Sequence, residues 1–531
     1  MKDLISKGTK KKKKEKKTIL HEYYGEAKPL KKSLDENLSI IKKILGDPSD
    51  LIIRELVIGK EIPQKIALII IDGLTNGQFV HDFILKGLVY EIRTAELSPE
   101  VKINSFKDIL LNCSLPLSDV EELSNFKDLF EKLLSGDSVI LFDKLDSGLV
   151  IDTKGWQDRG IIEPSAETVI RGSRDSFNET LRTNTMLIRR RIKDINLRVI
   201  NRVVGTITKT SVTIMYLEGL AKEDIVKDVI DRIDLINIDG ILESGNIEEL
   251  LVDNIYSLFP TMYTTERPDK VAGNLLEGRI AILTDGTPFV LVVPAVFMQF
   301  FQSSEDYYQR WIFASFIRSI RYLSFFLALL TPSVYIAITT FHHEMLPTSL
   351  LLNISGQRES VPFPAVVEVF FMEVTFEILR EAGLRMPRAI GSAISIVGAL
   401  VLGEAAVNAG VVSNIMVIIV SLTAITSLIF PEYSFSSPVR LLRFVFIILS
   451  SIIGLYGIAI GLMMLTIHLC SLQSFGVPYM YPLAPLSLSG LKDAIIRTPI
   501  KTHIKRPQII TENDLIRQSQ TEITNKKSGE K

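Results

Sequence analysis

Acidic side chains recur at every fourth position in an otherwise apolar segment, EVFFMEVTFEILRE, where they are Glu373, Glu377 and Glu381. Residues four apart lie on one face of an α-helix, so the three form an acidic stripe, whereas Glu368 faces elsewhere. At membrane depth, such a stripe either pairs with arginines, of which Arg380 is adjacent, or lines a wet path for cations. In a ring of subunits the stripe would be repeated around the axis, which favours cations. We therefore consider these three glutamates as ion-pathway residues.

A second polar cluster, His342, His343 and Glu344, could suggest a metal. Adjacent histidines point apart on a helix and no third ligand is evident, so we expect no metal site. The stretch 206–210 (TITKT) lacks the glycines of a phosphate loop, and no Gly-x-Gly-x-x-Gly follows a strand. We expect no catalytic residues, no cofactor and no enzymatic activity. His468 is interpreted as an interfacial polar residue.

Three long apolar segments are available to position the acidic stripe. Residues 323–341, 411–430 and 444–469 contain no Asp, Glu, Lys or Arg. At 1.5 Å per residue, about 20 residues cross a hydrocarbon core of roughly 30 Å. We expect each segment to be one membrane span.

Two weaker segments, 362–379 and 389–407, are expected at membrane depth and shielded from lipid by the other helices, because both contain acids. Residues 289–301 are too short to span and indicate a strand followed by an interfacial piece.

Basic residues ahead of the spans predict the orientation, because Lys and Arg prefer the cytoplasmic side. They are Arg310, Arg318, Arg321, Arg385, Arg388, Arg440 and Arg443. Five crossings would leave the basic C-terminal tail outside, so one weak segment is re-entrant or a further crossing is present. We expect an even number of crossings with both termini in the cytoplasm.

Small residues at four-residue spacing indicate close helix packing. They are Gly391, Ser395, Ala399, Gly403, Gly457 and Gly461. This spacing is compatible with packing inside one subunit and with contacts between subunits.

The first 300 residues have the pattern of a soluble region. Apolar runs at 66–71 and 139–142 predict buried strands of one α/β domain. A β-branched run at 203–215, a helix at 222–233 and a hairpin that turns at Asp285 and Gly286 predict a second unit. The fold class expected is an α/β cytoplasmic N-terminal region of two subdomains followed by an all-α polytopic membrane domain.

The domain boundaries follow from these patterns. We expect a disordered Lys-rich arm (1–30), two cytoplasmic α/β subdomains (31–160 and 161–300), a transmembrane domain (301–475) and a C-terminal cytoplasmic tail (476–531). The arm holds seven lysines in positions 10–17, which are typical of a solvated tail or of attraction to anionic lipid headgroups.

Between the two soluble units, Ser176 and Glu179 have capping-box spacing ahead of a helix that ends in Arg189, Arg190 and Arg191. We expect the arginines to be a solvated helix terminus that complements the helix dipole. The chain has 60 Lys plus Arg against 61 Asp plus Glu, so its charge gives no reason to expect nucleic acid as a partner. Two cysteines exclude a disulfide framework.

Several long motifs resemble those of the A subunit of spore germination receptors of endospore-forming bacteria. They are RGSRDSFNETLRTNTMLIRRRI (171–192), EGRIAILTDGTPFVLVVPAVFMQFFQSSEDYYQR (277–310), FHHEMLPTSLL (341–351), PFPAVVEVFFMEVTFEILREAGLRMP (362–387) and QSFGVPYMYPLAP (473–485). The resemblance covers about residues 50–499.

The resemblance implies a multi-pass protein of the spore inner membrane with a cytoplasmic N-terminal domain. It implies work with a permease-like B subunit and a lipoprotein C subunit, and self-association into a nutrient-gated cation channel whose opening triggers germination. The alternatives are a secondary transporter, for which no internal symmetry is visible, and a non-conducting scaffold subunit.

Overall fold

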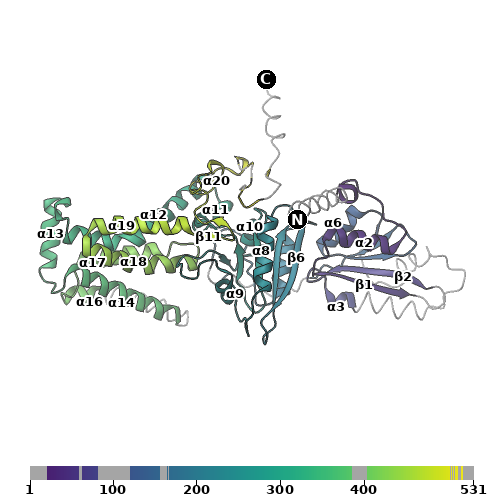
Figure 1. Ribbon diagram of the computed structural model, residues 1–531, viewed down its shortest axis with the longest axis horizontal. Helices are drawn as coiled ribbons and strands as arrows, with labels where there is room; N and C mark the ends of the chain where they lie inside the picture. The colour runs from purple at the N-terminus through teal and green to yellow at the C-terminus, as the bar shows by residue number, and fades with distance from the viewer. Residues whose placement is uncertain are drawn as a thin grey trace, which may run out of the picture.

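The computed structural model describes residues 21–58, 63–81, 120–155, 164, 167–385, 403–502, 504, 506, 509–511 and 516–517. The lysine run and the expected packing positions Gly391, Ser395 and Ala399 lie outside these residues. Figure 1 shows a bundle of helices at one end of an elongated molecule and two β-sheets at the other.

The first sheet forms around the apolar run predicted at 66–71. Its strands are β1 (Leu51–Ile58), β2 (Gln64–Ile71), β3 (Val120–Leu123), β4 (Ser138–Phe142) and β5 (Gly148–Ile151). The order is β1-β2-β4-β5-β3, and every neighbouring pair is antiparallel. Alternate residues of β2 face opposite sides, and helices α2 (Leu34–Leu45) and α6 (Phe126–Ser135) cover one of them. The strands predicted at 66–71 and 139–142 are confirmed.

The second sheet repeats the strand order of the first. Its strands are β6 (Leu197–Val204), β7 (Thr210–Leu217), β8 (Tyr263–Thr265), β9 (Ile280–Thr284) and β10 (Val290–Val293), in the order β6-β7-β9-β10-β8. If the strands of each sheet are counted along the chain, both sheets have the spatial order first, second, fourth, fifth, third. The predicted hairpin is confirmed, since β9 pairs antiparallel with β10 and Gly286 turns at a φ of 89°.

Helices lie on both faces of the second sheet. One face packs on α8 (Glu223–Asp234) and α9 (Ser244–Leu251), and the other on α7 (Leu181–Arg191) and α10 (Pro268–Leu275). The helix predicted at 222–233 is α8. The β-branched run at 203–215 contains the end of β6, a turn and most of β7, because Gly205 at a φ of 92° breaks it.

The capping box predicted ahead of α7 is wrong. The helix begins at Leu181 after Thr180, whose side chain makes no cap hydrogen bond. The Ser176 hydroxyl instead donates to the backbone oxygens of Phe177 and Glu266, at 3.1 and 3.2 Å. It therefore fastens the segment before α7 to the end of β8.

The prediction of solvated arginines at the end of α7 is also wrong. Arg189 is 2% exposed, and its Nε and Nη2 donate to the two carboxylate oxygens of Asp50 at 2.6 and 2.9 Å. Arg191 pairs with Asp175. Asp50 immediately precedes β1, so the Arg189 pair links the first sheet to the helix that packs on the second.

The last ten residues of the expected arm, 21–30, are packed. Helix η1 (His21–Gly25) lies on α6, where the ring of Tyr23 contacts the edge of Phe126 at a centroid distance of 5.2 Å. Leu30 is 4% exposed and belongs to the main core.

The C-terminal half is helical. Its main helices are α12 (Trp311–Thr340), α13 (Thr348–Arg358), α14 (Ala365–Arg385), α16 (Gly403–Asn408), α17 (Asn414–Ser427), α18 (Tyr433–Ile453) and α19 (Leu455–Ser471). Among the described residues, α12 and α18 are long and apolar enough to cross a membrane, while α17 and α19 are shorter apolar helices. Helix α14 accounts for the weak segment 362–379, and most of the weak segment 389–407 lies outside the described residues.

The single last span predicted at 444–469 is wrong, because two helices occupy it. Helix α18 ends at Ile453, and Gly454, at a φ of 60° and a ψ of −136°, starts α19 in the opposite direction. Gly461 of α19 lies against Phe446 of α18, as an antiparallel hairpin requires. The sequence predicts one span because the run is apolar throughout, and nothing distinguishes Gly454, where the chain turns, from the glycines at 457 and 461.

An aromatic cluster joins the sheets to the helices. Helix η4 (Phe297–Phe301) follows β10, and its Phe297 ring contacts Phe325 of α12, Phe435 of α18 and Tyr479 at 5.5 to 6.0 Å. Phe301 stacks on Tyr322 at 4.3 Å. Each of these aromatic pairs stabilises the fold by about 0.5–1.5 kcal/mol beyond the contribution of the buried apolar area. The cluster therefore stabilises the packing of the helices against η4.

Candidate functional site

The acidic stripe lies on α14 and faces α18. Glu373, the innermost member, is fully buried and accepts a hydrogen bond from Arg443 Nη1 at 2.5 Å. Arg443 is 1% exposed, and its Nε donates to the backbone oxygen of Ala328 on α12 at 2.9 Å. One guanidinium therefore ties three helices together.

One turn further along α14, Glu377 accepts from Arg440 Nη1 at 2.8 Å, with both side chains about four-fifths buried. Another turn on, Glu381 pairs with Arg385 of the same helix at 2.7 Å, and both are largely exposed. The stripe predicted from four-residue spacing is thus one row of three ion pairs. Its burial decreases towards the end of α14.

Each of the two inner carboxylates keeps one oxygen without a partner in the described part of the chain. These atoms are Oε1 of Glu373 and Oε1 of Glu377, and both are buried. Buried carboxylate oxygens normally accept hydrogen bonds, so each is a place for a water, a proton or a cation. The role of Glu373, Glu377 and Glu381 in an ion pathway stays a prediction.

Glu368, which faces away from the stripe, organises a different helix. Its Oε1 accepts from the backbone N–H and the hydroxyl of Ser413, at 2.5 and 2.6 Å. Ser413 is the N-cap of α17. A carboxylate at a helix N-terminus is favoured by the helix dipole, so Glu368 fixes the start of α17 against α14.

Two of the predicted packing positions, Gly457 and Gly461, lie where α19 approaches α18. A Cβ on Gly457 would be 2.2 Å from the backbone oxygen of Leu449, and one on Gly461 would be 2.7 Å from the Phe446 ring. Gly403 is looser, since the nearest atom to its Cβ would be a methyl of Val417 at 3.6 Å. Gly457 and Gly461 are therefore positions of close approach within one chain.

A buried charge network joins the start of α12 to the C-terminal segment. Asp306, on α11 (Glu305–Tyr308), is 3% exposed and pairs with Arg318 and Arg321 at 3.1 and 2.8 Å. Arg318, which is fully buried, also pairs with Asp493 at 3.1 Å. Sequence reasoning missed this site because it treated the two arginines as basic residues flanking a span.

The C-terminal segment continues along the same junction. The Tyr307 hydroxyl donates to Asp493 at 2.7 Å, and burial raises the pKa of Tyr307 well above its ordinary value. Arg497 Nη1 donates to the backbone oxygen of Gln309 at 2.9 Å. At the end of α19, His468 Nε2 lies 3.1 Å from the Ser257 hydroxyl, in the sheet region. The chain therefore enters and leaves the helix bundle at the same end.

The histidines at 342 and 343 follow α12 at the opposite end of the bundle. Nδ1 of His342 is 3.3 Å from the backbone oxygen of Ala337, and its Cε1 would lie 2.8 Å from a Cβ on Gly454. Residues His343–Met345 form a short 3₁₀ turn. His342 thus packs beside the turn between α18 and α19.

Comparison with known proteins identifies the chain's relatives. Residues 39–509 match the family described as Bacillus/Clostridium GerA spore germination protein. Spore germination protein KA of Bacillus subtilis (strain 168) is 49% identical over 486 residues, which cover 92% of this chain and 88% of that protein. The uncharacterized membrane protein YfkQ of the same organism is 41% identical over 480 residues, which cover 90% and 92% of the two chains.

A solved structure is also similar to the N-terminal half. It is the crystal structure of the N-terminal domain of the A subunit of the Bacillus megaterium spore germinant receptor GerK3. It is 37% identical, covers 51% of this chain and 98% of that chain, and has a TM-score of 0.40. From the family match and the two relatives, the chain belongs to the GerA family of spore germination proteins.

Proposed function

We propose that the chain is the membrane subunit of a nutrient germinant receptor in the spore inner membrane. It forms an oligomeric, nutrient-gated cation channel and acts with a permease-like B subunit and a lipoprotein C subunit, while its sheets face the cytoplasm. Membership of the GerA family supports the role in germination, and the helix bundle supports the membrane location.

The surface of the bundle supports contact with lipid. Helices α17, α18 and α19 expose large apolar side chains, including Ile418, Ile452 and Met463, each at 65 to 67% exposure. Soluble monomers rarely leave contiguous apolar surface of this kind in water. Together with α12 and α18, which have the length and composition of spans, this surface favours a membrane-embedded bundle.

The path of the chain supports an even number of crossings. Helix α12 starts beside the second sheet, α19 ends there, and the C-terminal segment returns to the start of α12 through Asp493 and Arg497. The break at Gly454 supports this count, because it divides the one expected span into α18 and the shorter apolar helix α19, which the proposal treats as two crossings. Both ends of the bundle segment are therefore placed on the cytoplasmic side in this proposal.

The single observation that carries the channel proposal is the pair of buried carboxylates, Glu373 and Glu377, each with one oxygen that has no hydrogen-bond partner among the described residues. With Glu373 and Glu377 paired to arginines of α18, and Arg380 close to Glu377, the two carboxylates offer little attraction to a cation. If α14 separates from α18, the arginines leave and a ring of carboxylates lines the path. Nutrient bound to a partner subunit would shift the population towards this separated state.

A non-conducting scaffold is the second candidate function, and the same ion pairs also favour it. In the described part of the chain, all three stripe acids have arginine partners within one subunit. Such pairs could act only to hold helices together. Measurement of ion release separates the two candidates.

The test uses spores of the native host that carry Glu377→Gln in this chain. The channel proposal predicts altered release of monovalent cations on addition of nutrient, with an unchanged amount of the chain in the membrane fraction. Glu359→Gln is the matched control, because Glu359 is an exposed acid just beyond α13 and outside the stripe. Release that is the same in both variants and in the wild type would contradict the ion-pathway assignment.

A further inference from the structure

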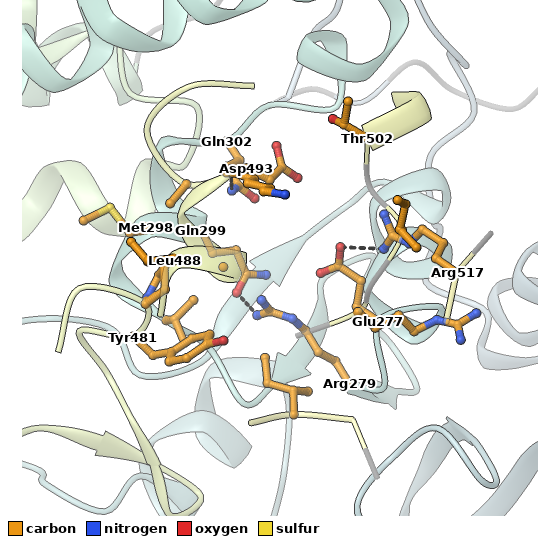
Figure 2. A pocket seen from close by; sticks show the side chains of 18 residues that line it. Glu277, Arg279, Met298, Gln299, Gln302, Tyr481, Leu488, Asp493, Thr502 and Arg517 are labelled. Atoms are coloured by element: carbon orange, nitrogen blue, oxygen red, sulfur yellow. Dashed lines mark hydrogen bonds and ion pairs between the residues drawn. The ribbon is translucent and has the colours of Figure 1, made fainter. Parts of the chain in front are cut away.

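A cavity of about 440 Å³ lies where the second sheet, helix η4 and the C-terminal segment meet. Figure 2 shows its lining: Arg279 immediately precedes β9, Gln299 comes from η4, and Tyr481 and Leu488 come from the C-terminal segment. Pockets for small molecules typically measure about 300–1,000 Å³, so the space is adequate for one. It is separate from the acidic stripe on α14.

Arg279 is the unusual group in this cavity. Its residue is 5% exposed, and its Nη1 donates to the backbone oxygen of Pro294 at 2.9 Å and to Gln299 Oε1. Its Nε is buried without a partner, and no carboxylate of the described residues forms an ion pair with it. Burial lowers the pKa of Arg279 from its ordinary value, and the nearby carboxylate of Glu277 opposes this shift only in part.

Gln299 is held so that it supports the guanidinium. Its Nε2 donates to Asn274 Oδ1 at 3.1 Å, which leaves Oε1 facing Arg279. In Figure 2 the Arg279 and Gln299 side chains point toward one another beside the open space. The arginine is therefore fixed in place before any ligand arrives, which lowers the entropic cost of binding.

The acidic residues that line the cavity already form ion pairs with arginines other than Arg279. Glu277 pairs with Arg517 at 2.9 Å, and Asp493 pairs with Arg318 and accepts from Tyr307. Lys492 adds a further positive charge to the wall. A buried guanidinium without a directly paired carboxylate is costly, so an anion entering this cavity would add a negative charge where Glu277 compensates Arg279 only in part.

We propose that this cavity binds a small soluble anion, whose carboxylate or phosphate oxygen accepts a hydrogen bond from the Arg279 guanidinium. The ligand lies between the second sheet and residues 481–494, so it stabilises the docked position of the C-terminal segment. Because Asp493 in that segment also pairs with Arg318 of α12, an occupied cavity strengthens the junction between the sheets and the helix bundle. The site does not depend on whether the bundle conducts ions.

The test measures binding to the full chain in nanodiscs of phosphatidylcholine, whose headgroup has no net charge. Sodium malonate and sodium phosphate are titrated separately by calorimetry, and sodium chloride at matched ionic strength is the baseline. We expect saturable binding of at least one of the two anions, which distinguishes a carboxylate from a phosphate ligand. Arg279→Met should weaken it at least tenfold, whereas Arg202→Met, in an exposed pair with Asp234, should not.

A second variant covers the case in which Arg279→Met fails to fold. Leu488 is 75% exposed and lines the cavity, so Leu488→Trp fills the space without touching the arginine. It should abolish binding and leave the thermal unfolding temperature close to that of the wild type. Absence of binding to the wild type, or full-affinity binding to Leu488→Trp, would overturn the proposal.

Discussion

The buried pair of Glu373 and Arg443 gives the sharpest energetic prediction. Glu373→Met removes the carboxylate and leaves a guanidinium that is 1% exposed without its charge partner. Breaking one side of a buried ion pair costs about 3–5 kcal/mol, which corresponds to more than a hundredfold change in the unfolding equilibrium. We expect Arg443→Met to cost at least as much, because it also removes the hydrogen bond to Ala328.

The double variant separates a charge effect from a packing effect. Two methionines are an apolar replacement for the pair, so most of the loss should be recovered, leaving about 1 kcal/mol for the orphaned carbonyl of Ala328. Glu381→Met, in the exposed pair with Arg385, is the matched control and should cost only about 0.3–0.5 kcal/mol. The assay is reversible unfolding of the full chain in mixed micelles, followed by circular dichroism. Equal losses for Glu373→Met and Glu381→Met, or strict additivity in the double variant, would refute the reasoning.

Three further predictions concern other parts of the chain. Arg189→Met leaves Asp50 buried without its bidentate partner and should lower stability by about 3–5 kcal/mol, measured by denaturant unfolding, while Asp50→Asn with Arg189→Met should recover part of it. Gly457→Ala should destabilise the α18–α19 hairpin by about 1–3 kcal/mol in the same measurement, and Gly356→Ala, where a Cβ meets nothing within 4 Å, should be neutral or stabilising. Burial, and secondarily Glu243, raises the pKa of Glu248 from 4.5 to about 7, so the native state holds a proton that the unfolded state releases. Stability from this group is complete below pH 4.5 and is lost as the pH rises through 7, so Glu248→Gln should flatten the fall in unfolding temperature between pH 5 and 8.

Local patterns in the sequence predict much of the sheet region. The buried strands at 66–71 and 139–142 are continuous apolar runs, and the hairpin at Asp285 and Gly286 has turn chemistry that leaves few alternatives. The repeated strand order of the two sheets is invisible in the sequence, because it depends on pairings between strands far apart in the chain.

The charge partners are where sequence reasoning fails most. Arg189 at the end of α7 has the pattern of a solvated helix terminus, and only tertiary structure brings Asp50 to it from 139 positions away. Similarly, Arg318 has the position of a residue that flanks a span, yet it is buried between Asp306 and Asp493. Four-residue spacing does predict that the stripe acids share a face, but it cannot say which helix supplies their arginines.

The most direct test of the channel proposal is cation flux through the reconstituted receptor. The chain is placed in proteoliposomes with its B and C partner subunits, and potassium efflux is recorded before and after nutrient is added. We predict efflux that depends on nutrient, is absent without this chain, and changes in rate or cation selectivity with Glu377→Gln but not with Glu359→Gln. Nutrient binding to the assembled complex without any potassium efflux would contradict the proposal and leave the chain as a scaffold.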